Sequence, residues 1–217
     1  MKVLVACEYS GIVRDAFTKK GHEAVSCDII PTESPGKHIQ DDVLNHLNLE
    51  KNQWDLIIAH PPCTYLSNAG ARHLYPKGKL NEARYKKGLN AKRFFMCLYN
   101  MDCRVAVENP IPSTIFKLPK YDQIIQPYEY GHGYSKKTLL WLNNLPKLTP
   151  TNILTRYEPL LPSNTGGKKR GQKRVEQLKA DDFEHNRRLY AKPKRFRAKY
   201  ERLVANLEPN MSKYHPF

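Results

Sequence analysis

Residues 54–63 read WDLIIAHPPC, a short apolar run that ends at two consecutive prolines. The run predicts a buried strand of a parallel sheet, in which both faces are covered by other elements. Proline fixes φ and lacks a backbone N–H, so Pro61 and Pro62 predict a stiff, extended exit that cannot continue the sheet. We therefore expect Cys63 to be held at one point above the edge of the sheet.

Outward from this strand, residues 1–145 alternate between strand-like and helix-like stretches, a pattern typical of βαβ units. A helix is expected after Gly11, and further helices at residues 42–49 and 80–101. Residues 131–133 are expected to form the turn between the last two strands. The sequence predicts an α/β protein with a mostly parallel, Rossmann-like sheet flanked by helices. The other expected strands are residues 3–7, 23–28, 104–107, 124–128 and 138–142.

The character of the chain changes after Pro150. Residues 151–217 carry 16 Lys and Arg against 7 Asp and Glu, and residues 165–174 read as a flexible basic loop. The length of 217 residues fits one α/β domain with an appendage. We predict a main domain over residues 1–150 and a basic extension over residues 151–217, with a helix near residues 196–207.

The formal net charge of +15 favours a polyanionic partner, of which nucleic acid is the commonest. Residues 77–93 add seven Lys and Arg to one Glu, placed shortly after the diproline. Two plainer interpretations stay open: the charge keeps the protein soluble, and residues 77–93 form a solvated helix face.

Five cysteines are scattered without a CxxC pair, so we expect reduced thiols. Zinc requires four well-spaced ligands, and we expect no metal site. No apolar run reaches the ~18 residues of a membrane span, and the N-terminus does not resemble a signal peptide. We expect a cytoplasmic protein with no membrane partner.

Three strand ends carry residues suited to a nucleotide cofactor, because ligands bind beyond the carboxyl ends of such strands. Glu8, Tyr9, Ser10 and Gly11 form a turn into a helix, whose first N–H groups could bind an anionic group. Asp28 ends the second strand, where an acid can bind ribose hydroxyls. Asp41 and Asp42 could contact an adenine amino group.

Cys63 and Glu108 are the candidate catalytic residues. A thiol acts as a nucleophile when its surroundings favour the thiolate, and a carboxyl beside an aromatic base can share a proton with a ring nitrogen. The alternatives are that Cys63 is a small buried side chain, and that Asn109 or Ser113 merely caps the next helix.

Pro61-Pro62-Cys63, then Glu108-Asn109, then Tyr130-Gly131 with Ser135-Lys136-Lys137-Thr138-Leu139 follow one another in the chain. This order resembles the cytosine C5 methyltransferases, whose motifs are an FxGxG-type turn, PPC, ENV and YGxPQxRxR. More specifically, the chain resembles small phage-borne members with HPPCTYL, ENP and QPYxYGHxxxKKTxLWL. The resemblance covers about residues 1–150 and implies a class I S-adenosylmethionine-dependent methyltransferase fold, in the host-cell cytoplasm if phage-encoded.

The resemblance implies that the Cys63 thiolate adds to C6 of cytosine while Glu108 protonates or hydrogen-bonds N3. C5 then takes the methyl group of S-adenosylmethionine, and a base within duplex DNA must first flip out. The residues implied to bind the cofactor are Glu8, Tyr9, Ser10, Gly11, Asp28, Ile29, Asp42 and Pro61. Those implied to bind the substrate are Pro62, Asn109, Lys136, Lys137 and Thr138.

The chain departs from the family pattern at several positions. Val13 and Arg14 stand where further glycines are usual, ENV has become ENP, and Thr138 replaces the second arginine of the last motif. No long recognition insert follows that motif, so we expect the protein to have low sequence selectivity, to recognise a short sequence, or to obtain its selectivity from a partner. The alternatives are the same chemistry on RNA or a free cytidine nucleotide, and a non-catalytic nucleic-acid-binding protein on this fold. An amino methyltransferase is disfavoured, because it would want an acid or amide before the prolines.

Overall fold

The computed structural model describes residues 1–47 and 53–159. The basic loop expected at residues 165–174 and the helix expected near residues 196–207 lie outside this part of the chain. The elements are β1 Lys2–Ala6, α1 Ile12–Lys19, β2 Glu23–Asp28, β3 His38–Gln40, η1 Val43–His46, β4 Leu56–Ala59, α2 Asn68–Ala71, η2 Pro76–Gly78, α3 Glu82–Tyr99, β5 Arg104–Asn109, η3 Thr114–Phe116, β6 Gln123–Ile125, η4 Pro127–Glu129, β7 Tyr134–Ser135, β8 Thr138–Asn143 and β9 Glu158–Pro159.

Seven strands form one sheet in the order β3-β2-β1-β4-β5-β8-β6. The pairs from β3 to β5 are all parallel, whereas β8 runs antiparallel to both of its neighbours. The prediction of an α/β protein with a mostly parallel sheet is confirmed. The chain builds outward from β1 to β3 and then returns to place β4 on the other side of β1. Ligands bind at such a reversal of strand order, beyond the carboxyl ends of the two central strands.

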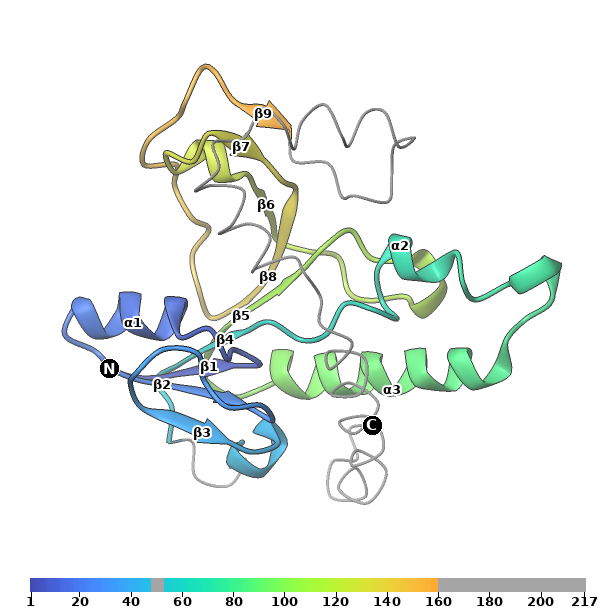
Figure 1. Cartoon of the computed structure of the whole chain (residues 1–217), viewed down its shortest axis with the longest axis horizontal. Helices are drawn as coiled ribbons and strands as arrows, with labels where there is room; N and C mark the ends of the chain where they lie inside the picture. Colours follow the sequence, from blue (N-terminus) through green and yellow to red (C-terminus); the bar gives the residue numbers. More distant parts are fainter. Residues whose placement is uncertain (48–52, 160–217) are drawn as a thin grey trace. The chain divides into compact units, whose positions relative to one another are not determined.

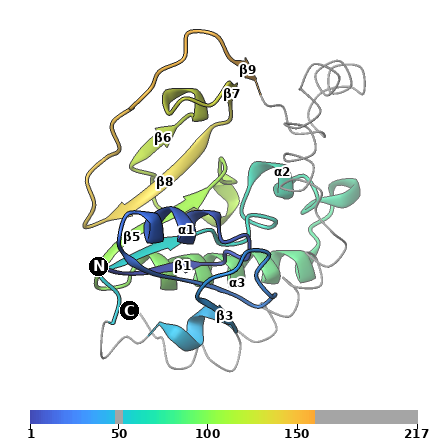
Figure 2. The same cartoon turned by 60° about the vertical axis from the view of Figure 1, so that its left-hand side comes forward.

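The sheet buries both of its faces, and alternate residues of each strand point to opposite sides. Leu4 and Ala6 of β1 pack in the same cluster as Phe94 of α3. Val3 and Val5 of β1 pack in a second cluster with side chains of α1. Helices α1 and α3 therefore cover opposite faces of the sheet (Figures 1 and 2). Burying each large aliphatic or aromatic side chain contributes about 1.5–3 kcal/mol.

Helix α3 is the longest helix that the structure describes. It begins after Asn81, whose side chain accepts a hydrogen bond from the Arg84 N–H at 3.0 Å. Glycine inside a helix costs about 1 kcal/mol relative to alanine, yet Gly88 sits in the middle of α3. A Cβ at Gly88 would collide with the Phe116 ring, so the missing side chain lets η3 pack closely on the helix.

The last strands differ from the expectation in how they are joined. Strands β6 and β8 pair antiparallel, with Ile125 opposite Thr138, but residues 131–133 are not a tight hairpin between them. The intervening chain instead forms η4 and β7, and β7 pairs in parallel with β9. The sequence around Gly131 indicates a turn, but it does not indicate that η4 precedes this turn and that β7 follows it.

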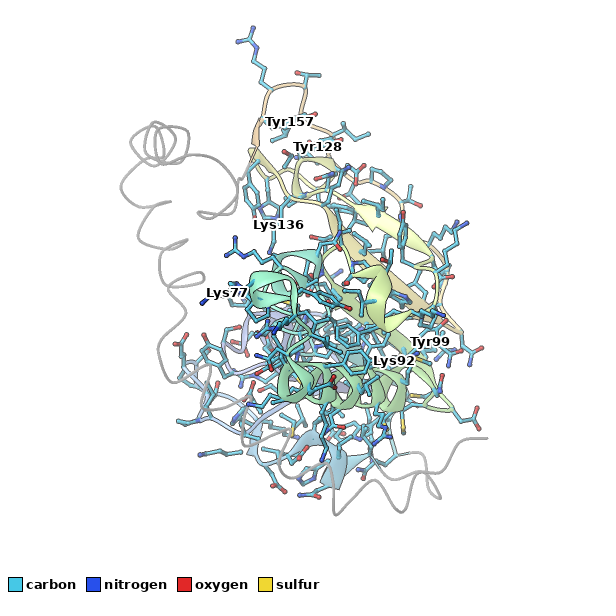
Figure 3. The ribbon with its side chains drawn as sticks, turned by 90° about the vertical axis from the view of Figure 1, so that its right-hand side faces the viewer. Lys77, Lys92, Tyr99, Tyr128, Lys136 and Tyr157 are labelled. Atoms are coloured by element: carbon cyan, nitrogen blue, oxygen red, sulfur yellow. The ribbon has the colours of Figure 1, made fainter. Side chains whose placement is uncertain are left out.

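The described residues divide into two compact units. The first comprises residues 1–125 and 137–148, apart from residues 48–52, and contains the seven-stranded sheet; the second comprises residues 126–136 and 149–159. In the second unit the rings of Tyr128 and Tyr157 stack with centroids 3.9 Å apart and planes 4° from parallel (Figure 3). The predicted boundary at residue 150 stays a prediction, because most of the chain beyond it lies outside the described residues.

Candidate active site

Strands β4 and β5 bring the diproline segment and Glu108 to the same edge of the sheet. Ala59 pairs with Val107 in the parallel register, which places His60 beside Glu108 and Pro61 beside Asn109 one and two residues further on. Glu108 and Asn109 belong to β5 itself, whereas the sequence suggested that the strand ends at residue 107. The strand therefore fixes the directions of both side chains.

Asn109 ties β5 to the exit of β4. Its side chain is completely buried, and its Nδ2 donates a hydrogen bond to the Pro61 carbonyl at 3.3 Å. Pro61 and Pro62 are buried as well. The Asn109 Oδ1 is also buried but has no hydrogen-bond partner. Buried polar atoms normally have hydrogen-bond partners, so this Oδ1 is an acceptor beside the diproline that a bound ligand could use.

Cys63 lies on the turn that follows the diproline, and it is half-buried. Its carbonyl accepts a hydrogen bond from the Ser67 N–H at 3.0 Å. Two further backbone hydrogen bonds join this turn to the chain after Glu108, from Ser113 N–H to the Leu66 carbonyl at 2.7 Å and from Asn68 N–H to the Ile111 carbonyl at 3.0 Å. The segments that carry the two candidate catalytic residues are thus fastened together through their main chains.

Arg84 of α3 also holds the turn, a role that the sequence did not reveal. Its Nη2 donates to the carbonyls of Thr64 at 3.2 Å and Gly70 at 3.0 Å, and its guanidinium lies 4.7 Å from the centre of the Tyr65 ring. A Cβ at Gly70 would collide with the Thr64 carbonyl oxygen, so α2 approaches the turn as closely as its backbone allows. Within a run of seven basic residues, nothing distinguished Arg84 from its solvent-facing neighbours.

The rest of the basic run has several exposed members. Lys77, Lys79, Lys86 and Arg93 are exposed, on η2, on α3 and on the segment between them. Figure 3 shows Lys77 on η2 and Lys92 on α3. Residues 82–93 are therefore part of a regular helix, with Arg84 turned toward the Cys63 turn and other basic side chains turned toward solvent.

The turn after β1 is occupied by the chain's own carboxylate. Glu8 is nearly buried, and its oxygens accept hydrogen bonds from the N–H groups of Val13 at 2.7 Å and Arg14 at 3.2 Å. Ser10 Oγ donates to Glu8 and accepts from the Ile12 N–H. We expected these first N–H groups of α1 to be open to an anionic ligand, but Glu8 and Ser10 cap them. The direct roles predicted for Glu8 and Ser10 in cofactor binding stay predictions.

Arg14 fills the space behind this turn. Its side chain is 1% exposed, and its guanidinium donates to the side chains of Asp15, Ser26 and Thr32 and to the carbonyls of Ser34 and Pro35. A Cβ at Gly36 would lie 2.7 Å from the guanidinium carbon. Arg14 is therefore a buried cation that holds the loop after β2.

The ends of β1, β2 and β3 bring the predicted cofactor residues close together. The pKa of the half-buried Tyr9 phenol is raised by burial and further by the carboxylates of Glu33 and Asp28. Burial raises the pKa of the Cys27 thiol to about 12, with added effects from Asp28, Asp41 and Asp42. The first turn and the two acidic strand ends therefore share one region.

Two carboxyls in this region differ in how their oxygens are used. Asp28 is nearly buried at the end of β2 and accepts the Ile30 N–H at 3.1 Å; Ile29 beside it packs against the core. Asp42 caps η1 through Oδ1, which accepts the Leu44 N–H at 3.0 Å, whereas its Oδ2 is buried without a partner. Burial raises the pKa of Asp42 above its ordinary value. An unpaired buried acceptor at this place suits a ligand that donates a hydrogen.

The last sequence motif contributes three predicted substrate contacts, of which two belong to the unit that contains the sheet and one belongs to the second unit. Thr138 begins β8, next to Leu139, which pairs with Asn109 at the end of β5, so Thr138 reaches the same sheet edge as Glu108. Lys137 precedes it and is exposed. Lys136 is half-buried and belongs to the second unit.

Neither the models of known protein families nor the curated proteins contain a match to this chain. In residues 1–47 and 53–159, no helix is long and apolar enough to cross a bilayer. In the same residues, no group of three or more His, Cys, Asp or Glu side chains is placed to hold a metal ion.

Proposed function

We propose that this protein is an S-adenosylmethionine-dependent methyltransferase that acts on C5 of cytosine in DNA. The observation that carries the proposal is the union of the Cys63 turn and the end of β5 at one sheet edge. Parallel register, the Asn109–Pro61 hydrogen bond and two backbone hydrogen bonds hold these segments together. A nucleophile and a proton-sharing carboxyl are the two groups that addition to a pyrimidine requires.

In the proposed reaction, the Cys63 thiolate forms a bond to C6 of the cytosine. Glu108 shares its proton with N3, so negative charge does not build up on the ring. The electron pair released toward C5 would then form the new carbon–carbon bond as the methyl–sulfur bond of the bound S-adenosylmethionine breaks, leaving S-adenosylhomocysteine. The C5 proton passes to a water molecule and its electron pair restores the C5–C6 double bond; the sulfur–C6 bond breaks, Cys63 leaves as a thiolate, and the N3 proton returns to Glu108.

S-adenosylmethionine supplies the methyl group when bound. The residues near β1, β2 and β3 fit its adenosine part. The free Oδ2 of Asp42 is an acceptor for an amino group, and Asp28 ends β2 where ribose hydroxyls can be bound. Tyr9, Ile29 and Pro61 complete the predicted contacts around it. The cofactor carboxylate requires donors other than the Val13 and Arg14 N–H groups, which Glu8 takes.

The exposed basic residues of η2 and α3 favour DNA over a free nucleotide. They follow the Cys63 turn directly in the chain, and the whole protein carries a net charge of +15. A mononucleotide offers one phosphate group, whereas a polynucleotide offers a phosphate for each basic side chain. Thr138 and Lys137 at the start of β8 are the proposed contacts to the flipped cytosine and its phosphate, and Pro62 and Asn109 complete the proposed substrate contacts of this unit. The role of Lys136 in the second unit stays a prediction.

The test is mass spectrometry of nucleosides from the DNA of cells that express the protein, with Cys63→Ser and Cys103→Ser variants alongside. We expect 5-methylcytosine with the wild type and Cys103→Ser, and none with Cys63→Ser, since serine is too weak a nucleophile without a base to activate it. Cys103 precedes β5 and lies at the opposite end of that strand from Glu108, which makes it a matched control. Full activity of Cys63→Ser would refute the assignment of the nucleophile.

Purified protein distinguishes the alternatives. DNA that contains 5-fluorocytosine should form a denaturant-resistant adduct with Cys63, because the C5 substituent cannot leave as a proton. Parallel assays with RNA and dCMP identify the other substrates. A protein that binds DNA but is not stabilised by S-adenosylhomocysteine would instead be a non-catalytic binding protein.

A further inference from the structure

We propose that His60 is a positioning residue that holds Glu108 in the orientation required for protonating the base; this inference rests on the proposed function. His60 stands immediately before the diproline, and its Nδ1 lies 3.7 Å from Oε2 of Glu108. The two side chains are about equally exposed, 32% for His60 and 28% for Glu108. They form a half-open pair at the edge of the sheet where the reaction is proposed to occur.

The pairing follows from strand register. His60 continues β4 by one residue, and Glu108 is its neighbour on β5, since Ala59 is opposite Val107. The His60 N–H also donates to the Ala6 carbonyl at 3.0 Å, which anchors the residue to β1. Alternation along both strands places His60 and Glu108 on the same side of the sheet. The backbone thus presents the imidazole to the carboxylate.

The surroundings of the ring select one tautomer. Nε2 of His60 is buried and has no hydrogen-bond partner. An N–H at that position would be buried without an acceptor, and an unmade hydrogen bond of a buried donor costs about 1–3 kcal/mol. The favoured neutral ring therefore keeps Nε2 bare and carries its hydrogen on Nδ1, facing Glu108.

The distance of 3.7 Å is longer than a hydrogen bond, so the Nδ1–H attracts Oε2 electrostatically in this state. Catalytic contacts are often long without substrate and shorten in the complex. When the Nδ1–H holds Oε2, the carboxyl group cannot rotate freely and its Oε1 is presented to N3 of the cytosine. His60 itself exchanges no proton with the substrate.

Two substitutions separate positioning from mere packing. His60→Leu removes the donor, and His60→Asn places a side-chain amide N–H close to the position of Nδ1. Since general acid–base catalysis as a whole contributes about 10²–10⁴-fold, we expect His60→Leu to lower kcat by about 10–100-fold. We expect His60→Asn to recover most of that loss, with KM for DNA and the Kd for S-adenosylhomocysteine nearly unchanged in both variants. His22→Leu, at the opposite edge of the sheet just before β2, is the matched control.

Three results would overturn the proposal: unchanged kcat in His60→Leu, equal loss in His60→Leu and His60→Asn, or a large fall in the alkylation rate of Cys63 in His60→Leu. The last result would mean that His60 acts on the thiol.

A measurement that needs no activity separates this inference from the proposed function. Nitrogen-15 NMR of the free protein should show His60 as the Nδ1–H tautomer, with its ring signals shifted in Glu108→Gln. An Nε2–H tautomer would refute the positioning role even if the wild type methylates DNA. The expected tautomer in a protein that forms no methylcytosine would refute the proposed function and leave the His60–Glu108 contact without a catalytic role.

Discussion

Replacing Arg14 with lysine keeps the positive charge, yet it should strongly destabilise the fold. The Arg14 guanidinium is 1% exposed and makes five hydrogen bonds, three of them to the loop after β2 through Thr32, Ser34 and Pro35. A lysine ammonium is a single point and cannot span these acceptors. The loop after β2 would then lose most of the three hydrogen bonds that the Arg14 guanidinium makes to it.

The magnitude follows from these contacts. Hydrogen bonds to a charged group contribute about 1.5–3 kcal/mol each, but such values are not additive. Disrupting a buried charged group typically costs about 3–5 kcal/mol in total. We therefore expect Arg14→Lys to lower the free energy of unfolding by about 3–5 kcal/mol, out of the 5–15 kcal/mol that is typical of a domain.

Urea denaturation followed by tryptophan fluorescence measures this loss, because Trp141 is completely buried and reports on the core. The control is Arg93→Lys, an exposed position on α3, which should change stability by less than about 0.5 kcal/mol. Ser26→Ala removes one partner of Arg14, 3.1 Å from its Nη1, and should cost about 1–3 kcal/mol. A loss below about 1 kcal/mol for Arg14→Lys would refute the role assigned to the guanidinium.

Two further substitutions test the cofactor region and the Cys63 turn. Asp42→Asn should stabilise the free protein at neutral pH. Burial raises the pKa of Asp42, so the folded state loses stability as the pH rises through that pKa and the carboxyl ionises. Asparagine does not ionise, and its side-chain oxygen can still cap η1. The same change should weaken S-adenosylhomocysteine binding by about tenfold or more, since a donor replaces the free Oδ2; calorimetry that finds unchanged affinity would exclude Asp42 from the cofactor site. Arg84→Met should lower the free energy of unfolding by about 1–3 kcal/mol, because its hydrogen bonds to the turn are lost, and it should slow adduct formation by Cys63. Normal adduct kinetics on 5-fluorocytosine DNA would show that the turn keeps its shape without Arg84. Lys87→Met is the control.

Elements that depend on local pattern were predictable from the sequence. The strand expected at residues 23–28 is β2, and the apolar run before the diproline contains β4. The helix expected at residues 80–101 is α3, shorter by two residues at each end because Asn81 caps it and Asn100 ends it. Apolar periodicity and proline report on the chain's own neighbours, so these predictions needed no knowledge of the tertiary structure.

The missing parts depend on contacts between segments distant in sequence. Nothing local to Arg14 indicates that Ser26 and the loop after β2 will surround it, so a basic residue in a first helical turn reads as exposed. The pairing of His60 with Glu108 requires β4 and β5 to be neighbours in register, and strand order is not written in either segment. Likewise, the cap formed by Glu8 depends on the sharp turn at Cys7, whose φ of 61° is unusual for a residue other than glycine.

The two backbone hydrogen bonds between residues 66–68 and residues 111–113 have a mechanical consequence. Loops that are joined main chain to main chain move as one body, so pushing on either displaces both. Such a joint does not depend on which side chains the loops carry. Surface residues on the two loops can therefore be exchanged, to suit a different stretch of the proposed nucleic-acid substrate, while the backbone that carries the Cys63 sulfur and the Glu108 carboxylate keeps its dimensions.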